Sequence, residues 1–469
     1  MRGLFRKVTT MGLFRPVLGV LGAILLALRL ALPKIGVGWM FALLTSNFNR
    51  ITIFELGVTA VLVTTMISMH NFLSPFQMII GRIADRRPIL GLRRTPYMLA
   101  GATIASLVFL VLPTVAEGMG SGSPLAFVGG FAMLLIFGVG LAAMGDSHHS
   151  MIAERIAPAK RGGVISVVWT FTILSAIIAA GVIKVMMPHY TPESMQALYS
   201  LTPLVVISST LLGIIGIERR LRADEIDAAI TRARLAAPPG NPIRSAITLL
   251  RENPQVRAFF AFVLLSILAI FMQDAILEVF GAEVFGMSVA ETTSFTQIWG
   301  GGVLGGMLLM GILSSLTSIS KKTIAMIGGG GTAVGLGLLT ICAMTGQQSL
   351  LNPALIFMGL FTGFFNVGAL ALMMEMTVEG ATGLYMGLWG TAQAFGSGLA
   401  SVVSGGLKTA LIETNLMGAQ IGYTAIFGIE TLVMVVGIAA LSTVSIAQFH
   451  GFNRADLARA LEVEAGAAA

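Results

Sequence analysis

An arginine and a glutamate close an otherwise apolar run of this chain, which reads Phe48-Asn49-Arg50-Ile51-Thr52-Ile53-Phe54-Glu55-Leu56-Gly57. Arg50 and Glu55 would lie in lipid-like surroundings, where polar side chains are costly and need a reason. A second stretch, Met272-Gln273-Asp274-Ala275-Ile276-Leu277-Glu278, aligns with residues 49–55 at an offset of 223. We therefore interpret the chain as two copies of one unit.

The composition indicates an integral membrane protein. Of the 469 residues, 55% are hydrophobic and 11% are charged, whereas a soluble domain carries roughly 25% charged residues. The mean hydropathy is +0.88, and the length accommodates about a dozen spans of about 20 residues each. The single cysteine, Cys342, excludes an intramolecular disulfide and a cysteine-based metal cluster. The net charge of +7 does not predict a nucleic-acid partner, because in a membrane protein the positions of the charges along the chain are more informative than their sum.

Six apolar segments, a basic linker and six more apolar segments predict an all-α membrane protein. We expect twelve transmembrane helices in two six-helix pseudo-symmetric halves, as in the major facilitator superfamily. The expected spans are 35–57, 58–81, 95–115, 124–150, 163–187 and 197–217, then 256–280, 290–316, 321–345, 350–375, 383–409 and 420–447. The predicted regions are an N-terminal interfacial amphipathic segment (1–32), an N-terminal half (33–217), a cytoplasmic linker (218–255), a C-terminal half (256–448) and a cytoplasmic tail (449–469).

The distribution of Lys and Arg predicts the orientation in the membrane. With the N-terminus inside, only Arg50, Lys184 and Lys408 of the 29 Lys and Arg residues fall on the outer side. An even number of spans then places both termini in the cytoplasm.

A basic turn follows the second expected span and reads Gly81-Arg82-Ile83-Ala84-Asp85-Arg86-Arg87. It resembles the Gly-x-x-x-Asp-Arg loop signature of the major facilitator superfamily. Glu154 and Glu375 end spans 4 and 10 at an offset of 221. We expect structural ion pairs at these positions, and their repetition in both halves leaves a symmetric inner gate as the alternative. Another interpretation is that the basic residues only fix the topology. The predicted cytoplasmic latch comprises Gly81, Asp85, Arg86, Arg93, Arg94, Glu154 and Glu375.

Longer motifs narrow the family. Besides residues 49–57, they are Ser74-Pro75-Phe76, Leu90-Gly91-Leu92-Arg93-Arg94-Thr95-Pro96-Tyr97 and Gly383-Leu384-Tyr385-Met386-Gly387-Leu388-Trp389-Gly390-Thr391-Ala392-Gln393-Ala394. These stretches resemble motifs of the bacteriochlorophyll delivery family, of PucC and LhaA type. The chain departs from that family at Leu92, where Trp is usual, and at residues 144–151, where Asp146, His148 and His149 replace a Thr-rich stretch.

The resemblance implies a membrane assembly factor for photosynthetic light-harvesting complexes. Such a protein would hand bacteriochlorophyll or a precursor to antenna polypeptides, or keep those polypeptides apart until they assemble. The implied partners are antenna polypeptides or a reaction-centre–antenna complex, the lipid bilayer, and enzymes of bacteriochlorophyll biosynthesis. The implied location is the bacterial inner or intracytoplasmic photosynthetic membrane.

Two charged residues form the centre of a predicted outer gate. Arg50 and Asp274 lie one position apart in the repeat alignment, and we hypothesise that they pair across the pseudo-two-fold axis. Breaking a buried ion pair costs about 3–5 kcal/mol. Glu55 and Glu278 are the symmetric members of this gate. The alternative is that each charge reaches the membrane interface separately.

Five polar residues are candidate pigment ligands, because a neutral imidazole can bind the magnesium of a chlorophyll. The adjacent His148 and His149 point about 100° apart on a helix and cannot grip one metal from one face. Asp146 is a candidate for the second shell. Polar contacts between helices or a proton relay are the alternatives. The candidates are His70, Asn71, Asp146, His148 and His149.

The glycine clusters at 300–306 and 328–331 do not predict a nucleotide site, because no Gly-Lys-Ser/Thr follows them. The small-residue faces at 302–306 and 359–363 indicate close helix contact or a flat groove. The sequence contains no recognisable enzyme constellation, so we predict a non-enzymatic protein. The alternatives to an assembly factor are a structural subunit docked on a photosynthetic complex and a proton-coupled secondary transporter with Asp146, Asp274 or Glu55 as its proton site.

Overall fold

The structure is a computed structural model that describes residues 11–73, 80, 83–84, 86–222, 225–226, 242–377 and 382–450. Within these ranges the chain is almost entirely helical, apart from one isolated β-bridge between Ile89 and Leu92. Eleven helical segments of the described chain are long and apolar enough to cross a membrane. The predictions of an all-helical fold and of a multi-pass membrane protein are therefore confirmed.

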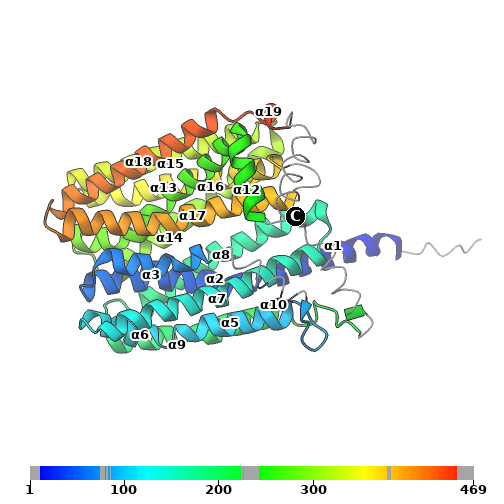
Figure 1. The fold of residues 1–469 in the computed structure, drawn as a ribbon, viewed down its shortest axis with the longest axis horizontal. Helices are drawn as coiled ribbons and strands as arrows, with labels where there is room; N and C mark the ends of the chain where they lie inside the picture. The colour runs from blue at the N-terminus through cyan, green and yellow to red at the C-terminus, as the bar shows by residue number, and fades with distance from the viewer. Residues whose placement is uncertain are drawn as a thin grey trace, which may run out of the picture.

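The helices gather into two groups that we call the N-lobe and the C-lobe (Figure 1). The N-lobe comprises α1 (Met11–Ala31), α2 (Pro33–Phe41), η1 (Ala42–Phe48), η2 (Ile51–Glu55), α3 (Ala60–Phe72), α5 (Thr95–Val108), α6 (Leu112–Gly120), α7 (Pro124–Arg155), α8 (Pro158–Met186), α9 (Pro192–Ser200) and α10 (Thr202–Ile214). The C-lobe comprises α12 (Pro242–Glu252), α13 (Pro254–Phe285), α14 (Val289–Leu316), α15 (Lys321–Thr345), η4 (Gln348–Leu350), α16 (Leu351–Glu375), α17 (Thr382–Lys408), η5 (Thr409–Glu413), α18 (Ala419–Ser442) and α19 (Ile446–His450).

Local sequence signals explain where several of these helices begin and end. Asn253 accepts hydrogen bonds from the backbone N–H groups of Gln255 and Val256 and so caps α13. Ser288 and Glu291 form a capping box at the start of α14. Gly286 ends α13 with a φ of +65°, a left-handed conformation that glycine adopts readily.

Each lobe has its own apolar core, and the two cores meet near α13 and α14. Aromatic side chains such as Phe137 and Tyr199 fill the N-lobe core, while Phe280 and Trp389 lie in the C-lobe core. Val279 of α13 is part of the N-lobe core cluster. Helix α3 packs against α17, and α8 packs against α14, so two helix pairs join the lobes.

We name the two ends of the helical bundle after the arginine that lies at each. The Arg50 end is where η2 ends, α3 begins, α13 ends and α14 begins; it lies at the left of Figure 1. The Arg94 end is opposite, where α5 begins and α7 ends.

The expected second span, 58–81, lies partly outside the described residues. Its described part is α3, which is shorter than the other spans. At the N-terminus, α1 continues into α2 through Leu32, which has helical dihedral angles. Residues 21–55 therefore form one long apolar helical unit, so no helix end lies at the predicted boundary between residues 32 and 33.

The small-residue faces of α14 and α16 pack against each other. A Cβ added at Gly306 would lie 2.0 Å from the carbonyl oxygen of Leu360, and one at Gly363 would lie 2.4 Å from that of Val303. Since no side chain fits between these backbones, the faces make close helix contact. That was one of the two alternatives from the sequence.

A pair of glycines on α15 tests this packing rule. A Cβ at Gly328 would lie 2.2 Å from the backbone nitrogen of Phe365 on α16, whereas one at Gly330 meets nothing within 4 Å. We expect Gly328→Ala to lower the free energy of unfolding by about 1–3 kcal/mol, because rigid backbone must move. Gly330→Ala is the control, and it should raise stability by up to about 1 kcal/mol through helix propensity. Unfolding in mixed detergent micelles measures both, and equal effects would contradict the packing argument.

Candidate functional site

The polar residues of the opening motif lie on π-helical turns between the lobes. Both η1 and η2 are π-helices, which are rare and frequent at functional sites. In an α-helix, residues five apart point about 140° away from each other. The i→i+5 repeat of a π-helix brings such residues onto one face. Arg50 and Glu55 therefore lie on the same face.

Arg50 is only 1% exposed and is held by three contacts. Its Nη1 donates to Glu55 Oε1 at 2.7 Å, its Nη2 donates to the carbonyl oxygen of Met287 at 3.0 Å, and its guanidinium lies over the Phe54 ring at 5.3 Å. Met287 belongs to the C-lobe, so one arginine ties the two lobes together at the Arg50 end.

The predicted ion pair between Arg50 and Asp274 is wrong. Arg50 pairs with Glu55, because the π-helical winding places that carboxylate on its own face. Asp274 forms no ion pair with any described residue. Asn49, next to Arg50, donates to the carbonyl oxygen of Ala275 and so provides the contact between the two aligned stretches.

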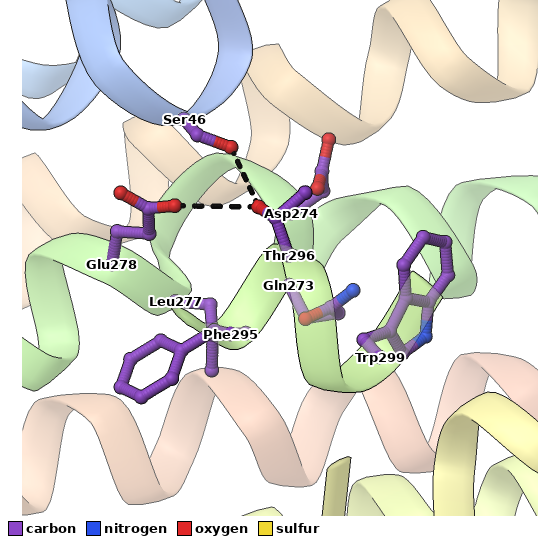
Figure 2. Close-up of a pocket in the computed structure, with 8 residues that line it drawn as sticks. All are labelled: Ser46, Gln273, Asp274, Leu277, Glu278, Phe295, Thr296 and Trp299. Atoms are coloured by element: carbon purple, nitrogen blue, oxygen red, sulfur yellow. Dashed lines mark hydrogen bonds between the residues drawn. The ribbon is translucent and has the colours of Figure 1, made fainter. Parts of the chain in front are cut away.

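A small cavity of about 10 Å³ lies between η1, α13 and α14, which is room for about one water molecule. Figure 2 shows Asp274 and Glu278 on successive turns of α13, with the hydroxyls of Ser46 and Thr296 between the lobes. Ser46 Oγ and Thr296 Oγ1 are 2.9 Å apart, and Thr296 Oγ1 donates to Glu278 Oε1 at 3.4 Å. The lining residues are Ser46, Gln273, Asp274, Leu277, Glu278, Phe295, Thr296 and Trp299.

A second ion network, which the sequence reasoning missed, lies at the same end. Lys408 is 1% exposed; its Nζ lies 3.0 Å from Glu283 and 2.9 Å from Glu413. The Glu413 carboxylate accepts the backbone N–H of Ala60 at 3.1 Å and so caps α3 from the opposite lobe. Like Arg50 and Glu55, Lys408 and Glu413 are five residues apart at a π-helical segment, η5.

That spacing was available as a sequence signal. A basic residue followed five positions later by Glu, at the end of an apolar run, occurs at Arg50–Glu55 and at Lys408–Glu413. Two of the three basic residues that were predicted to lie on the outer side, Arg50 and Lys408, are thus buried charges inside the protein. They are not loop residues that mark topology.

The Arg94 end is held within the N-lobe. Glu154 binds Arg94 at 2.8 Å and Arg93 at 3.3 Å. Glu218, which we did not single out, accepts the backbone N–H groups of Arg93, Arg94 and Thr95 and caps α5. The structure thus brings together Arg93, Arg94 and Glu154 of the predicted latch, while Arg86 is exposed. Gly81 and Asp85 lie outside the described residues.

Glu375 forms no ion pair with the described residues, although it occupies the position equivalent to Glu154. Within the described chain, the ion pairs are therefore present for Glu154 alone of the two aligned glutamates. At the start of α15, Lys322 donates to the carbonyl oxygens of Ser442 and Val444, at 2.8 and 2.7 Å.

The pigment-ligand candidates differ in accessibility. His70 Nδ1 is 2.7 Å from the carbonyl oxygen of Ile67, and its ring packs against the rings of Phe41 and Phe137. Asn71 reaches across the lobes to Ser397 at 3.5 Å.

The second group of candidates is on α7. His148 is 1% exposed and its Nε2 is 2.6 Å from the carbonyl oxygen of Leu30. His149 is exposed, and Asp146 is partly buried. Lys34 of α2 acts electrostatically on both imidazoles. The structure therefore separates an accessible His149 from two enclosed histidines.

This fold is that of an all-helical, multi-pass membrane protein. The fold is similar to that of the nucleoside transporter NupG, with a TM-score of 0.65 and 16% identity over 88% of this chain and 98% of that one. It is also similar to a POT family transporter solved with a thioalcohol-conjugated peptide, with a TM-score of 0.64 and 14% identity over 88% and 95% of the two chains. These likenesses concern the fold alone.

The chain belongs to the PUCC protein family, whose model matches residues 47–449. A relative named bacteriochlorophyll synthase 44.5 kDa chain, from Rhodobacter capsulatus, is 32% identical over 431 residues, covering 88% of this chain and 95% of the relative. Protein PucC of the same organism is 26% identical over 427 residues, covering 88% and 90%. The family resemblance drawn from the motifs is confirmed.

Double-mutant cycles test the partner of Arg50. We expect Arg50→Met and Glu55→Gln to show a coupling of about 0.5–3 kcal/mol in the free energy of unfolding, because the two side chains are in contact. Arg50→Met combined with Asp274→Asn should be close to additive, because Arg50 pairs with Glu55 and not with Asp274. A larger coupling to Asp274 than to Glu55 would restore the pair predicted from the sequence.

The two aligned glutamates test the asymmetry of the Arg94 end. Glu154→Gln should lower the free energy of unfolding by about 1 kcal/mol, a value reduced by the partial exposure of the pair. Glu375→Gln is the matched control and should change it by less than about 0.5 kcal/mol. Equal losses in the two variants would support a symmetric gate.

Proposed function

We propose that this protein is a membrane assembly factor for photosynthetic light-harvesting complexes, which binds or delivers bacteriochlorophyll, antenna polypeptides or both. The observation that carries the proposal is the family match over residues 47–449. The name of the Rhodobacter capsulatus relative, which refers to bacteriochlorophyll synthase, supports a tetrapyrrole cargo. The transporter-like fold favours handling of that cargo over a chemical reaction on it. Partners would be antenna polypeptides or a reaction-centre–antenna complex, and biosynthetic enzymes that supply the pigment.

We further propose the complete architecture. Helix α3 and the residues after it would form a twelfth span, giving two six-helix halves with the linker at 218–255 between them. The Arg94 end would face the cytoplasm together with both termini. Arg50 and Lys408 at the other end lie in ion pairs inside the protein, so they do not count as loop charges in the positive-inside rule. The membrane would be the bacterial inner or intracytoplasmic photosynthetic membrane.

His149 is the candidate pigment ligand that the geometry favours. A magnesium tetrapyrrole needs an imidazole nitrogen that is open to a flat ligand, and His149 is the exposed histidine on α7. His148 and His70 each place a ring nitrogen against a backbone carbonyl oxygen. Asp146 lies one turn away on α7 and would orient the site.

Purification in mild detergent tests this function. We expect the wild type to carry bacteriochlorophyll or a precursor, seen in the absorbance of the red band, or small antenna polypeptides, seen by mass spectrometry. His149→Leu should lose most of the pigment. His189→Leu, which removes an exposed loop histidine, is the control and should keep it. Polypeptide without pigment in the wild type would identify the polypeptide as the cargo and remove the role of His149.

A second candidate function is a proton-coupled secondary transporter. The observation that favours it is the buried acidic site between transporter-like lobes, and the fold is also similar to that of a D-xylose–proton symporter, with a TM-score of 0.61. A pigment-free protein that moves a soluble solute into liposomes would support it against the assembly factor. A tight complex with photosynthetic subunits, without cargo turnover, would indicate a structural subunit.

A further inference from the structure

Glu278 is a carboxyl group without a cation of its own. It is 5% exposed, its Oε1 accepts a weak bond from Thr296, and its Oε2 has no hydrogen-bond partner. Arg50 acts on it electrostatically, but the guanidinium is bonded to Glu55 and to the Met287 carbonyl oxygen. A carboxylate withdrawn from water without a partner costs several kcal/mol, whereas the protonated acid costs much less. The closed arrangement of the lobes therefore favours a protonated Glu278.

A second buried polar group lines the same cavity and indicates that a small ligand binds there. Gln273 is 2% exposed, and its Oε1 lines the cavity without a hydrogen-bond partner. Figure 2 places it beside Trp299, below the two acids. The hydroxyl groups of Ser46 and Thr296 complete an oxygen-rich lining. A cavity that holds about one water molecule, lined by such groups, can relay a proton but is too small for an organic solute.

Asp274 connects this cavity with the interior of the bundle. It lies one helical turn from Glu278 in the direction of the Arg94 end, is partly exposed, and lines the cavity. Two carboxylates on one helix face repel each other, so one proton held by the pair is favoured over none.

The charges on the other neighbouring elements are already compensated or exposed. On α17 and η5, Lys408 is shared by Glu283 and Glu413, and Tyr423 of α18 donates to Glu283. On α14, Glu291 is exposed and caps its own helix; on α8, Lys184 is exposed. Among the described residues near the cavity, these groups supply no free cation to Glu278.

We propose that Glu278 and Asp274 form a proton-binding site, and that the proton is held while the lobes are closed at the Arg50 end and released when they separate. The contacts that close this end adjoin the cavity: Ser46 to Thr296 at 2.9 Å, and Asn49 to the Ala275 carbonyl oxygen. Separation of the lobes admits water, which stabilises the ionised carboxylate. Closure thus binds a proton, so lower pH favours the closed state and higher pH favours the open one. The proposal goes beyond the assembly function, and for the proton-coupled transporter it names Glu278 as a further member of the proton site.

The test measures the distance between the lobes and the protonation of the carboxyl group separately. Spin labels on Ser121→Cys and Gln347→Cys, both exposed at the Arg50 end, report the distance between the lobes in a Cys342→Ala background. In the wild type we expect this distance to lengthen as pH rises. Infrared difference spectra should show loss of a protonated carboxylic acid band over the same pH interval.

Glu278→Gln imitates the protonated acid. It should remove that infrared band and hold the lobes closed at every pH. Glu291→Gln, at an exposed carboxylate, is the control and should leave both responses unchanged. An unchanged pH response in Glu278→Gln would overturn the proposal, as would a wild-type protein without a titrating carboxylic acid band. A response that follows Na⁺ at constant pH, with choline as the comparison cation, would overturn the proton as ligand. The infrared measurement on the wild type decides the question even if the variant does not fold.

Discussion

The structure depends on the burial of one arginine between two lobes. A guanidinium in such a place needs a counter-charge and further acceptors, because the cost of removing it from water is large. The chain supplies the counter-charge locally, from Glu55, and the other acceptor from the opposite lobe, the carbonyl oxygen of Met287. The local part requires a change of helix type, since five-residue spacing places two side chains on one face only when the turn is widened.

The same arrangement recurs with the roles of the lobes exchanged. In the N-lobe, Arg50 has Glu55 five residues on and reaches a carbonyl oxygen of the C-lobe. In the C-lobe, Lys408 has Glu413 five residues on, and that carboxylate caps α3 of the N-lobe. Each lobe thus offers the other one charged side chain at a terminus of a π-helical segment, Arg50 before η2 and Glu413 at the end of η5. Because both contacts use backbone groups of the partner lobe, they depend on the position of whole helices rather than on a rotamer.

The two ends of the bundle are built differently. At the Arg50 end, charged groups cross between the lobes and enclose a small polar cavity with a buried acid. At the Arg94 end, Glu154 and Glu218 hold Arg93, Arg94 and the start of α5 inside the N-lobe. At the corresponding position of the C-lobe, Lys322 at the start of α15 donates to the carbonyl oxygens of Ser442 and Val444 at the end of α18. The described charged contacts therefore connect the two lobes at the Arg50 end, whereas those of Glu154 and Glu218 at the Arg94 end lie within the N-lobe.

The amino-acid sequence by itself determined the membrane class, the all-helical fold, the helix order and the family. These follow from apolar runs, breaks and motifs that are local in the chain. It also marked Arg50, Glu55, Asp274 and Glu278 as the residues to examine. Only the tertiary structure decided that Arg50 pairs with Glu55, that no described cation forms an ion pair with Glu278, and that His149 is exposed while His148 is buried. The reason is that partner choice and exposure depend on helix winding and on the register between helices distant in the chain, which local patterns do not encode.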